Sequence, residues 1–253
     1  MIKLENTEVV GWEAAIRGMR NPMNSWEKSD SGYCEPNGNC DDCYNFSICN
    51  PNFEPYFKRF WEGSGIYCDF AIGPNDLDLM TRLRNAGTDH RKFMRMIVVY
   101  LDITAPLYWW KEFDTYKVST VANSCSTMHK IHEKEFIFDD FSYEKLINSA
   151  CMEIQEQHIR ISPIQALATT IECLNSYRDL YLQTKDKKYW WQMIQLLPSS
   201  YNQRRTVMLN YEVLANMYKS RRNHKLDEWH TFCDWIESLP YSELIIGKTE
   251  SAK

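Results

Sequence analysis

The first part of the chain carries three patterns of hydrophobic and polar residues, and each predicts an element. Apolar and polar side chains alternate over residues 2–10 and then recur with a helical period over residues 12–19, which predicts an edge strand followed by an amphipathic helix. Residues 75–88 read as a helix, because a capping residue precedes the periodic leucines and an Asn-Ala-Gly stop signal ends them. The short β-branched run 97–103 predicts a buried strand.

The second half of the chain is predicted to be mainly helical. Its apolar residues recur at helical spacing in five stretches, which are residues 143–157, 163–184, 188–196, 202–222 and 227–238. The pattern therefore indicates many helices and few strands, without an internal repeat.

Residues 104–130, TAPLYWWKEFDTYKVSTVANSCSTMHK, are the most informative stretch. Thr104 is predicted to cap an aromatic, buried helix that has Pro106 in its first turn. This helix would bring charged residues into an apolar setting, and buried charges are costly unless they are paired or bind a ligand. They are Lys111, Glu112, Asp114 and Lys117. The same residues also fit a helix end with internal ion pairs, in which Asp114 joins Lys111 and Lys117.

Three short polar residues follow at a spacing of three, namely Thr120, Asn123 and Ser126. This spacing would place them on one face of a helical turn, where hydroxyl and amide groups suit a phosphate or the edge of a base. The alternative is a hydroxyl-rich cap that ends the helix.

A segment at about residues 24–64 is rich in Ser, Asn, Gly, Pro and Asp and is predicted to be a loop insertion. It contains Cys34, Cys40, Cys43 and Cys49, four thiols that suit a structural zinc ion in a segment without a hydrophobic core of its own. Because the segment has a single CxxC, reduced cysteines in a surface insertion are the alternative. No histidine lies nearby to suggest a catalytic metal.

Composition narrows the function classes. The chain has 253 residues and a net charge of −5, which argues against a sequence-independent nucleic-acid binder. Because no apolar run is long enough to span a bilayer and the N-terminal region lacks a signal-peptide core, we expect a soluble, cytoplasmic protein. Aromatic residues make up 14% of the chain, and they suit either a planar ligand or an aromatic core.

The order of these motifs resembles the flavin-dependent thymidylate synthases. In that family a histidine precedes a buried strand, and His90 precedes the strand predicted over residues 97–103. The family's Arg-His-Arg triplet falls on Thr115-Tyr116-Lys117. The Ser, Asn and Ser that follow it in the family are similar to Thr120, Asn123 and Ser126, with one residue inserted.

The C-terminal half adds spacing to this resemblance, which covers roughly residues 75–232. Leu197-Pro198 matches a Leu-Pro of the family, Asn210 lies twelve residues beyond the proline, and Arg221 lies eleven beyond Asn210, without a gap.

The chain also departs from the family pattern. Lys117 is the only cation left in the triplet, and neither Thr nor Lys reproduces the bidentate geometry of Arg. Glu112 stands where the family usually has Gln, Glu212 where it has Arg, and Arg95 where it has an acidic residue. The nucleotide is therefore a different one, a more weakly bound one, or absent.

The resemblance implies an α+β fold, with a small, mainly antiparallel sheet flanked by long helices, in a single domain over residues 1–253 with the Cys-rich loop inserted. It implies an enzyme that reductively methylates a pyrimidine deoxynucleotide, such as dUMP to dTMP, with FAD, NADPH and methylenetetrahydrofolate. It further implies a homotetramer, with sites shared between subunits.

The resemblance also assigns binding roles to individual residues of this chain. The resemblance assigns His90, Asn123 and Asn210 to the flavin, with Tyr116 stacking on a ring. It assigns the substrate nucleotide to Glu112, Lys117, Thr120, Ser126 and Arg221, and it assigns no catalytic residue. Two other classes stay open, a nucleotide- or flavin-binding protein without turnover and an interaction protein that keeps only the fold.

Overall fold

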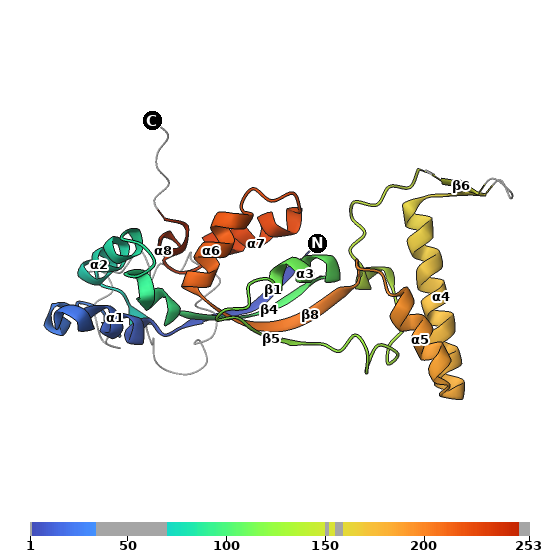
Figure 1. Cartoon of the computed structure of the whole chain (residues 1–253), viewed down its shortest axis with the longest axis horizontal. Coiled ribbons are helices and arrows are strands. Elements are labelled where there is room, and N and C mark those ends of the chain that lie inside the picture. Colours follow the sequence, from blue (N-terminus) through green and yellow to red (C-terminus); the bar gives the residue numbers. More distant parts are fainter. Residues whose placement is uncertain (1, 34–69, 150–151, 155–158, 248–253) are drawn as a thin grey trace, which may run out of the picture. The chain divides into compact units, whose positions relative to one another are not determined.

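The computed structural model describes residues 2–33, 70–149, 152–154 and 159–247, and its elements are labelled in Figure 1. The chain divides into two compact units. The first unit comprises Met1–Glu8, Tyr100–Met208 and Arg221–Trp235, and the second comprises Val9–Val99, Leu209–Ser220 and Ile236–Lys253. Both mix helices and strands, so the predicted α+β class is confirmed.

The main sheet has four strands in the order β1-β4-β8-β5. These strands are β1 (Lys3–Val10), β4 (Val98–Pro106), β8 (Asn202–Asn210) and β5 (Val121–Ser124). The strand β5 pairs antiparallel with β8, with Val121 opposite Met208 and Ser124 opposite Arg205. The predicted edge strand at the N-terminus is therefore confirmed as β1, and β5 forms the other edge.

The sheet has one buried and one more exposed face. Along β4, Val99 and Leu101 are at most 1% exposed, whereas Tyr100 between them is 40% exposed. This alternation is the period of two that a half-buried strand requires. It follows the predicted strand over residues 97–103, which the structure confirms and extends to Pro106.

An aromatic core fills the first unit beside α3 (Leu107–Phe113) and α7 (Asp227–Glu237). Trp109 is fully buried, with its ring centroid 4.7 Å from that of Trp229 and 5.7 Å from that of Phe232. Trp110 donates from Nε1 to the backbone oxygen of Gln203 on β8 at 3.0 Å. The aromatic side chains of this helix are therefore mainly core residues.

Two further helices of the first unit form a hairpin, α4 (Pro163–Thr184) and α5 (Lys187–Leu196), which lie side by side in Figure 1. Ser162 and Gln165 cap the start of α4 reciprocally, so Pro163 occupies the first helical position without losing a hydrogen bond. The hairpin encloses a second apolar core, made of Ile131, Phe136, Phe141, Leu167, Ile171, Leu174 and Met193. A separate antiparallel pair joins β6 (Met152–Ile154) to β7 (Ile159–Ile161).

The second unit contains α1 (Trp12–Arg20), α2 (Pro74–Asn85), the 3-10 helix η4 (Arg91–Arg95), most of α6 (Tyr211–Arg221) and α8 (Glu243–Ile246). The chain turns from β1 into α1 at Gly11, where φ is +96° and an added Cβ would lie 2.1 Å from the backbone oxygen of Met96. Only glycine fits there.

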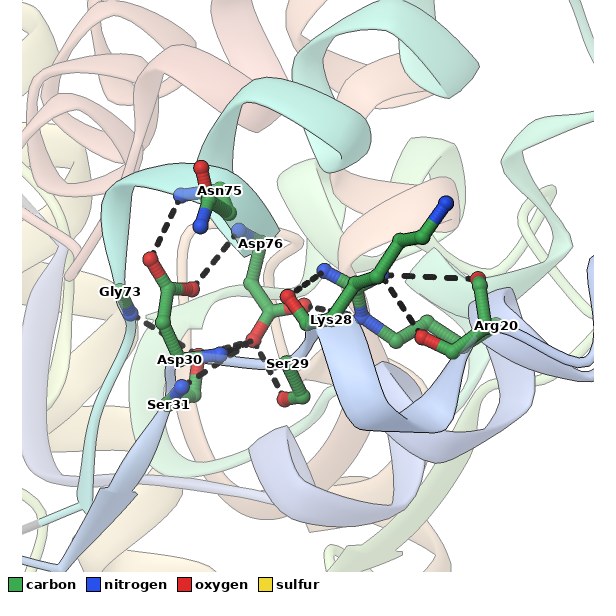
Figure 2. A network of polar contacts seen from close by, with 9 residues as sticks. Arg20, Lys28, Ser29, Asp30, Ser31, Gly73, Asn75 and Asp76 are labelled. Carbon is green, nitrogen blue, oxygen red and sulfur yellow. Dashed lines mark hydrogen bonds and ion pairs between the residues drawn. The ribbon is translucent and has the colours of Figure 1, made fainter.

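A buried polar network joins α1 to the start of α2 (Figure 2). Arg20 donates from Nε to Asp76 at 2.6 Å, and the Asp76 carboxylate also accepts from the hydroxyls of Ser29 and Ser31. Next to them, the short strands β2 (Gly32–Tyr33) and β3 (Phe70–Ala71) pair antiparallel. Tyr33 and Phe70 are thus direct partners in this pair.

Three predicted elements are wrong. Residues 202–222 are strand β8 followed by α6, not one helix. Of the helix predicted over residues 143–157, the described residues form turns and β6. The aromatic helix starts at Leu107 rather than after a Thr104 cap, because β4 continues through Pro106. None of the helices in the described ranges is long and apolar enough to cross a membrane.

Candidate functional site

Five side chains from two distant stretches of the sequence meet within the first unit. They are Glu112, Tyr116, Arg221, His224 and Trp229, and we call them the Glu112 cluster. Glu112 is in the last turn of α3 and Tyr116 in the turn that follows it. Arg221 ends α6, and Trp229 is in the first turns of α7.

One oxygen of Glu112 is the centre of the cluster. Its Oε2 accepts a hydrogen bond from Nη1 of Arg221 at 2.7 Å and from Nε1 of Trp229 at 3.1 Å. Nε2 of His224 lies 3.2 Å from the same oxygen. Two hydrogen bonds therefore orient this carboxylate, and the charge-assisted one from Arg221 is of the stronger kind.

The guanidinium of Arg221 is held by rings as well as by Glu112. Its Nε donates to the Tyr116 hydroxyl at 2.9 Å. Its central carbon lies 4.8 Å from the Trp229 ring and 5.5 Å from the Tyr116 ring, which is within the range of a cation–π contact. The side chain keeps 17% of its surface exposed, so the arginine is oriented but still accessible.

The charges of this region are arranged differently from the prediction. Lys111, Asp114 and Lys117 are exposed, and only Glu112 is partly buried, so the argument from costly buried charge was wrong for three of the four. Asp114 accepts from Nη1 of Arg205 on β8 at 2.7 Å instead of pairing with a lysine. Helix α3 is amphipathic, and its charged residues lie on the outer face.

The polar residues after the triplet do not lie on a helix. Asn123 is exposed on strand β5, opposite Thr206 of β8, and Thr120 precedes this strand. The hydroxyl oxygen of Ser126 accepts from the backbone N–H groups of residues 128 and 129 at 3.2 and 2.8 Å, so it stabilises a turn. The prediction of one helical face was therefore wrong.

Two groups in this segment have no polar partner among the described residues. Oγ1 of Thr120 is buried without a hydrogen bond. The ammonium of Lys117 is exposed and makes no hydrogen bond or ion pair with a described residue, so it is available to a ligand. Both belong to the first unit, like the Glu112 cluster.

A second polar group of the first unit lies across three strands. The carboxylate of Asp102 on β4 accepts from the Thr206 hydroxyl at 2.5 Å, from Asn6 at 2.9 Å and from Arg204 at 2.7 Å. The Thr206 hydrogen bond, followed by those from Asn6 and Arg204, lowers the pKa of Asp102 from 3.8 to about 2. This carboxylate is saturated and serves to join the strands.

Asp102→Asn is expected to remove about 1–2 kcal/mol of stability at neutral pH, a value discounted for solvent screening. Because the pKa is lower in the folded state, the contribution is full above pH 4 and falls as the pH drops toward 2. Urea unfolding at pH 7 and pH 3 checks this, since the gap between wild type and variant should narrow at pH 3. The same difference in free energy of unfolding at both pH values would contradict the role given to Asp102. Asp139→Asn, which changes an exposed carboxylate, is the control.

The remaining candidates lie in the second unit. Asn210 is the last residue of β8 and not part of a helix interior; its Oδ1 accepts from the backbone N–H of Val213 at 2.9 Å, so it caps α6. His90 is exposed and directly precedes η4. Neither side chain belongs to the Glu112 cluster.

Two of the departures from the family pattern contact each other in this unit. Glu212 accepts from Nε of Arg91 at 3.1 Å, and Nε of Arg95 lies 3.9 Å from its other oxygen, Oε2. That oxygen is buried and has no hydrogen-bond partner among the described residues. Glu212 and Arg95 therefore form an ion pair between α6 and η4.

Cys34, Cys40, Cys43 and Cys49 lie outside the described residues, so the structural zinc stays a prediction. In the described part of the chain no group of His, Cys, Asp and Glu side chains has the arrangement of a metal site. Sequence reasoning missed His224 and Trp229, and no spacing in the sequence singles them out. Their role depends on how α7 packs against α3.

The chain matches no family model and no curated protein. It is similar to solved structures. One is the flavin-dependent thymidylate synthase ThyX from Helicobacter pylori, complexed with FAD and dUMP, at 14% identity and a TM-score of 0.59, covering 96% of this chain and 98% of ThyX. Another is the UMP/dUMP methylase PolB from Streptomyces cacaoi, bound with 5-Br dUMP, at 11% identity and a TM-score of 0.51, covering 94% of this chain and 89% of PolB. At these identities the likeness establishes a shared fold.

Proposed function

We propose that this chain is a flavin-dependent methylase of the thymidylate synthase type, which acts on a pyrimidine deoxynucleotide such as dUMP. The observation that carries the proposal is the Glu112 cluster. The resemblance assigns Glu112, Tyr116 and Arg221 to ligand binding, and in the structure Arg221 contacts both of the others across more than a hundred residues of sequence. The shared fold with ThyX and PolB supports the same reading.

The residues of the first unit fit a nucleotide. Tyr116 presents a ring and a hydroxyl, and Arg221 presents an accessible guanidinium. The exposed Lys117 suits a phosphate, and Thr120 belongs to the proposal by the resemblance. In this proposal Arg221 and Tyr116 orient the pyrimidine, and Lys117, Thr120 and Ser126 bind the rest of the nucleotide.

The assignment of Asn123, Asn210 and His90 to a flavin is proposed on the resemblance alone, because Asn123 belongs to the first unit and the other two to the second. Asn123 is exposed on β5 and free to hydrogen-bond a ligand, and Asn210 keeps its amide N–H₂ although its oxygen caps α6. His90 offers an exposed imidazole. FAD, when bound, supplies the hydride-transfer chemistry that these side chains lack. NADPH, methylenetetrahydrofolate, a homotetramer and a cytoplasmic location belong to the proposal in the same way.

Arg221→Ala is expected to weaken dUMP binding about 10- to 100-fold, because a hydrogen bond to a charged group is worth roughly 1.5–3 kcal/mol. Isothermal titration calorimetry with dUMP measures the change. Arg222→Ala is the matched control, since it removes the same charge one residue further on, from a side chain that pairs with Asp234. Equal affinities of wild type and Arg221→Ala would overturn the nucleotide site.

A second function is favoured by the altered triplet. The Thr115 hydroxyl donates to the backbone oxygen of Glu112 at 2.7 Å, so it closes the end of α3 and does not face a ligand. A nucleotide- or flavin-binding protein without turnover fits this observation. Complementation of a thymidine-requiring host separates the two functions, because only the enzyme restores growth.

A further inference from the structure

We infer that Glu112 selects the ligand of this site by accepting a hydrogen bond from a ring N–H group, so that the cluster binds a base edge and not a phosphate. The inference rests on the proposed function and adds the identity of the group that is recognised. It follows from how the two oxygens of one carboxylate are used.

The first oxygen fixes the carboxylate. Oε2 of Glu112 accepts from Arg221 at 2.7 Å and from Trp229 at 3.1 Å, and Nε2 of His224 lies 3.2 Å away. These three residues come from the end of α6, from α7 and from the connection between them. A side chain oriented in this way loses little further conformational freedom when it binds a ligand.

The second oxygen of the Glu112 carboxylate is the one that can bind a ligand. Oε1 of Glu112 has no hydrogen-bond partner within the described ranges of the chain, and the side chain is 33% exposed. An ionised carboxylate is an acceptor only, so this oxygen is complementary to an N–H or O–H group and repels an anion. Next to Glu112, the Tyr116 hydroxyl accepts from Arg221 and keeps its own hydrogen for donation.

The charge balance of the cluster leads to the same conclusion. Nδ1 of His224 accepts from the backbone N–H of Leu226 at 3.2 Å. The charges of Arg221 and Glu112 offset each other, because the two groups form an ion pair at 2.7 Å. A phosphate would gain little electrostatic attraction here. A neutral polar edge, in contrast, finds donors in Arg221 and Tyr116 and an acceptor in Glu112.

The ligand edge that fits has an N–H group beside carbonyl oxygens. Glu112 accepts from the N–H, while Arg221 and Tyr116 donate to oxygens. This edge occurs in uracil and also in the pyrimidine ring of a flavin, so two ligands share the chemistry. Methylation of the ring nitrogen abolishes the donor in either of them and leaves the oxygens in place.

The test is calorimetry with wild type and Glu112→Gln, using dUMP, deoxyuridine, FAD and the 3-methyl derivatives of dUMP and riboflavin. We expect Glu112→Gln to weaken the binding of dUMP and of deoxyuridine by the same factor, about 10- to 100-fold. In wild type, the 3-methyl group should weaken the binding of dUMP by a similar factor. In Glu112→Gln it should weaken binding far less, because the substitution and the methyl group remove the same contact. If only FAD and 3-methylriboflavin show these effects, the recognised edge is that of the flavin.

Other outcomes overturn the inference. Unchanged or tighter dUMP binding by Glu112→Gln, together with unaffected flavin binding, would make Glu112 merely a counter-ion of Arg221. Wild type that binds neither dUMP nor FAD would overturn the proposed function itself. The 3-methyl probes act on wild type, so the test does not depend on the folding of a variant. Asp114→Asn is the matched control, since it removes the same charge two residues away and outside the cluster.

Discussion

Asp76→Ala is expected to lower the free energy of unfolding by about 3–5 kcal/mol, because it leaves a buried arginine without its counter-charge. Asp76 is fully buried and the Arg20 side chain is 5% exposed. Arg20 donates from Nε to Oδ1 of Asp76 at 2.6 Å, while its other nitrogens bind the backbone oxygens of Ser25 and Lys28. Urea unfolding followed by circular dichroism measures the loss.

The other oxygen of Asp76 explains why the cost is not limited to one ion pair. Oδ2 accepts from the hydroxyls of Ser29 and Ser31 at 2.7 and 2.6 Å (Figure 2). Burial by itself would raise the pKa of Asp76, but the hydrogen bonds from Ser29, Ser31 and Arg20 outweigh it and lower that pKa. The stabilisation is therefore present at neutral pH and is lost as the pH falls through the lowered pKa.

A matched control lies two residues further along α2. Asp78 is 65% exposed and pairs with Arg82 at 2.8 Å with a spacing of four residues, so Asp78→Ala should cost at most about 0.5 kcal/mol. Arg20→Met combined with Asp76→Leu should recover part of the loss, because an apolar pair avoids the cost of burying charge. Equal stabilities of Asp76→Ala and Asp78→Ala would contradict the role of the network.

Much of the fold follows from hydrophobic periodicity. The strand β1, the helices α1, α2, α4, α5 and α7, and the strand β4 all lie where the apolar pattern predicts them. Each has either a clear period or a strong boundary signal, such as Ser162-Pro163 at the start of α4. Long amphipathic elements with caps are the kind that sequence patterns identify best.

The strand β8 shows why other elements were missed. Its sequence NQRRTVMLN is rich in residues that favour helices, and it runs directly into α6, so the two read as one helix. Its buried positions nevertheless alternate, with Gln203, Val207 and Leu209 inward. Pairing with neighbouring strands outweighs local propensity here. Asn210 at the junction is the cap that marks the boundary.

Three residues that the resemblance assigns to ligands lie together in the structure, and their binding roles stay predictions. Glu112, Tyr116 and Arg221 meet as one cluster, yet the argument from buried charge was wrong because Lys111, Asp114 and Lys117 are exposed. Whether a charge on an amphipathic helix faces the core depends on the packing partner, which the sequence does not reveal. His224 and Trp229 enter the cluster only through that packing.

Trp229→Ala is expected to lower the free energy of unfolding by about 3–5 kcal/mol and to abolish ligand binding at the Glu112 cluster. Trp229 is fully buried, with its ring 4.7 Å from that of Trp109 and 5.6 Å from that of Phe232. Its Nε1 also donates to Glu112 at 3.1 Å, and its ring lies 4.8 Å from the Arg221 guanidinium. One side chain thus joins the aromatic core to the site.

Two companion variants separate the core contribution from the polar one. Trp229→Phe keeps most of the aromatic packing but removes the N–H, so it should cost less stability than alanine while still loosening Glu112 and weakening dUMP binding. Trp191→Ala removes an indole that is 43% exposed and should cost less than about 1 kcal/mol. Unfolding in urea gives the stabilities, and calorimetry with dUMP gives the affinities. If Trp229→Phe binds dUMP as tightly as wild type, the indole N–H does not orient Glu112, and Trp229 serves the core alone.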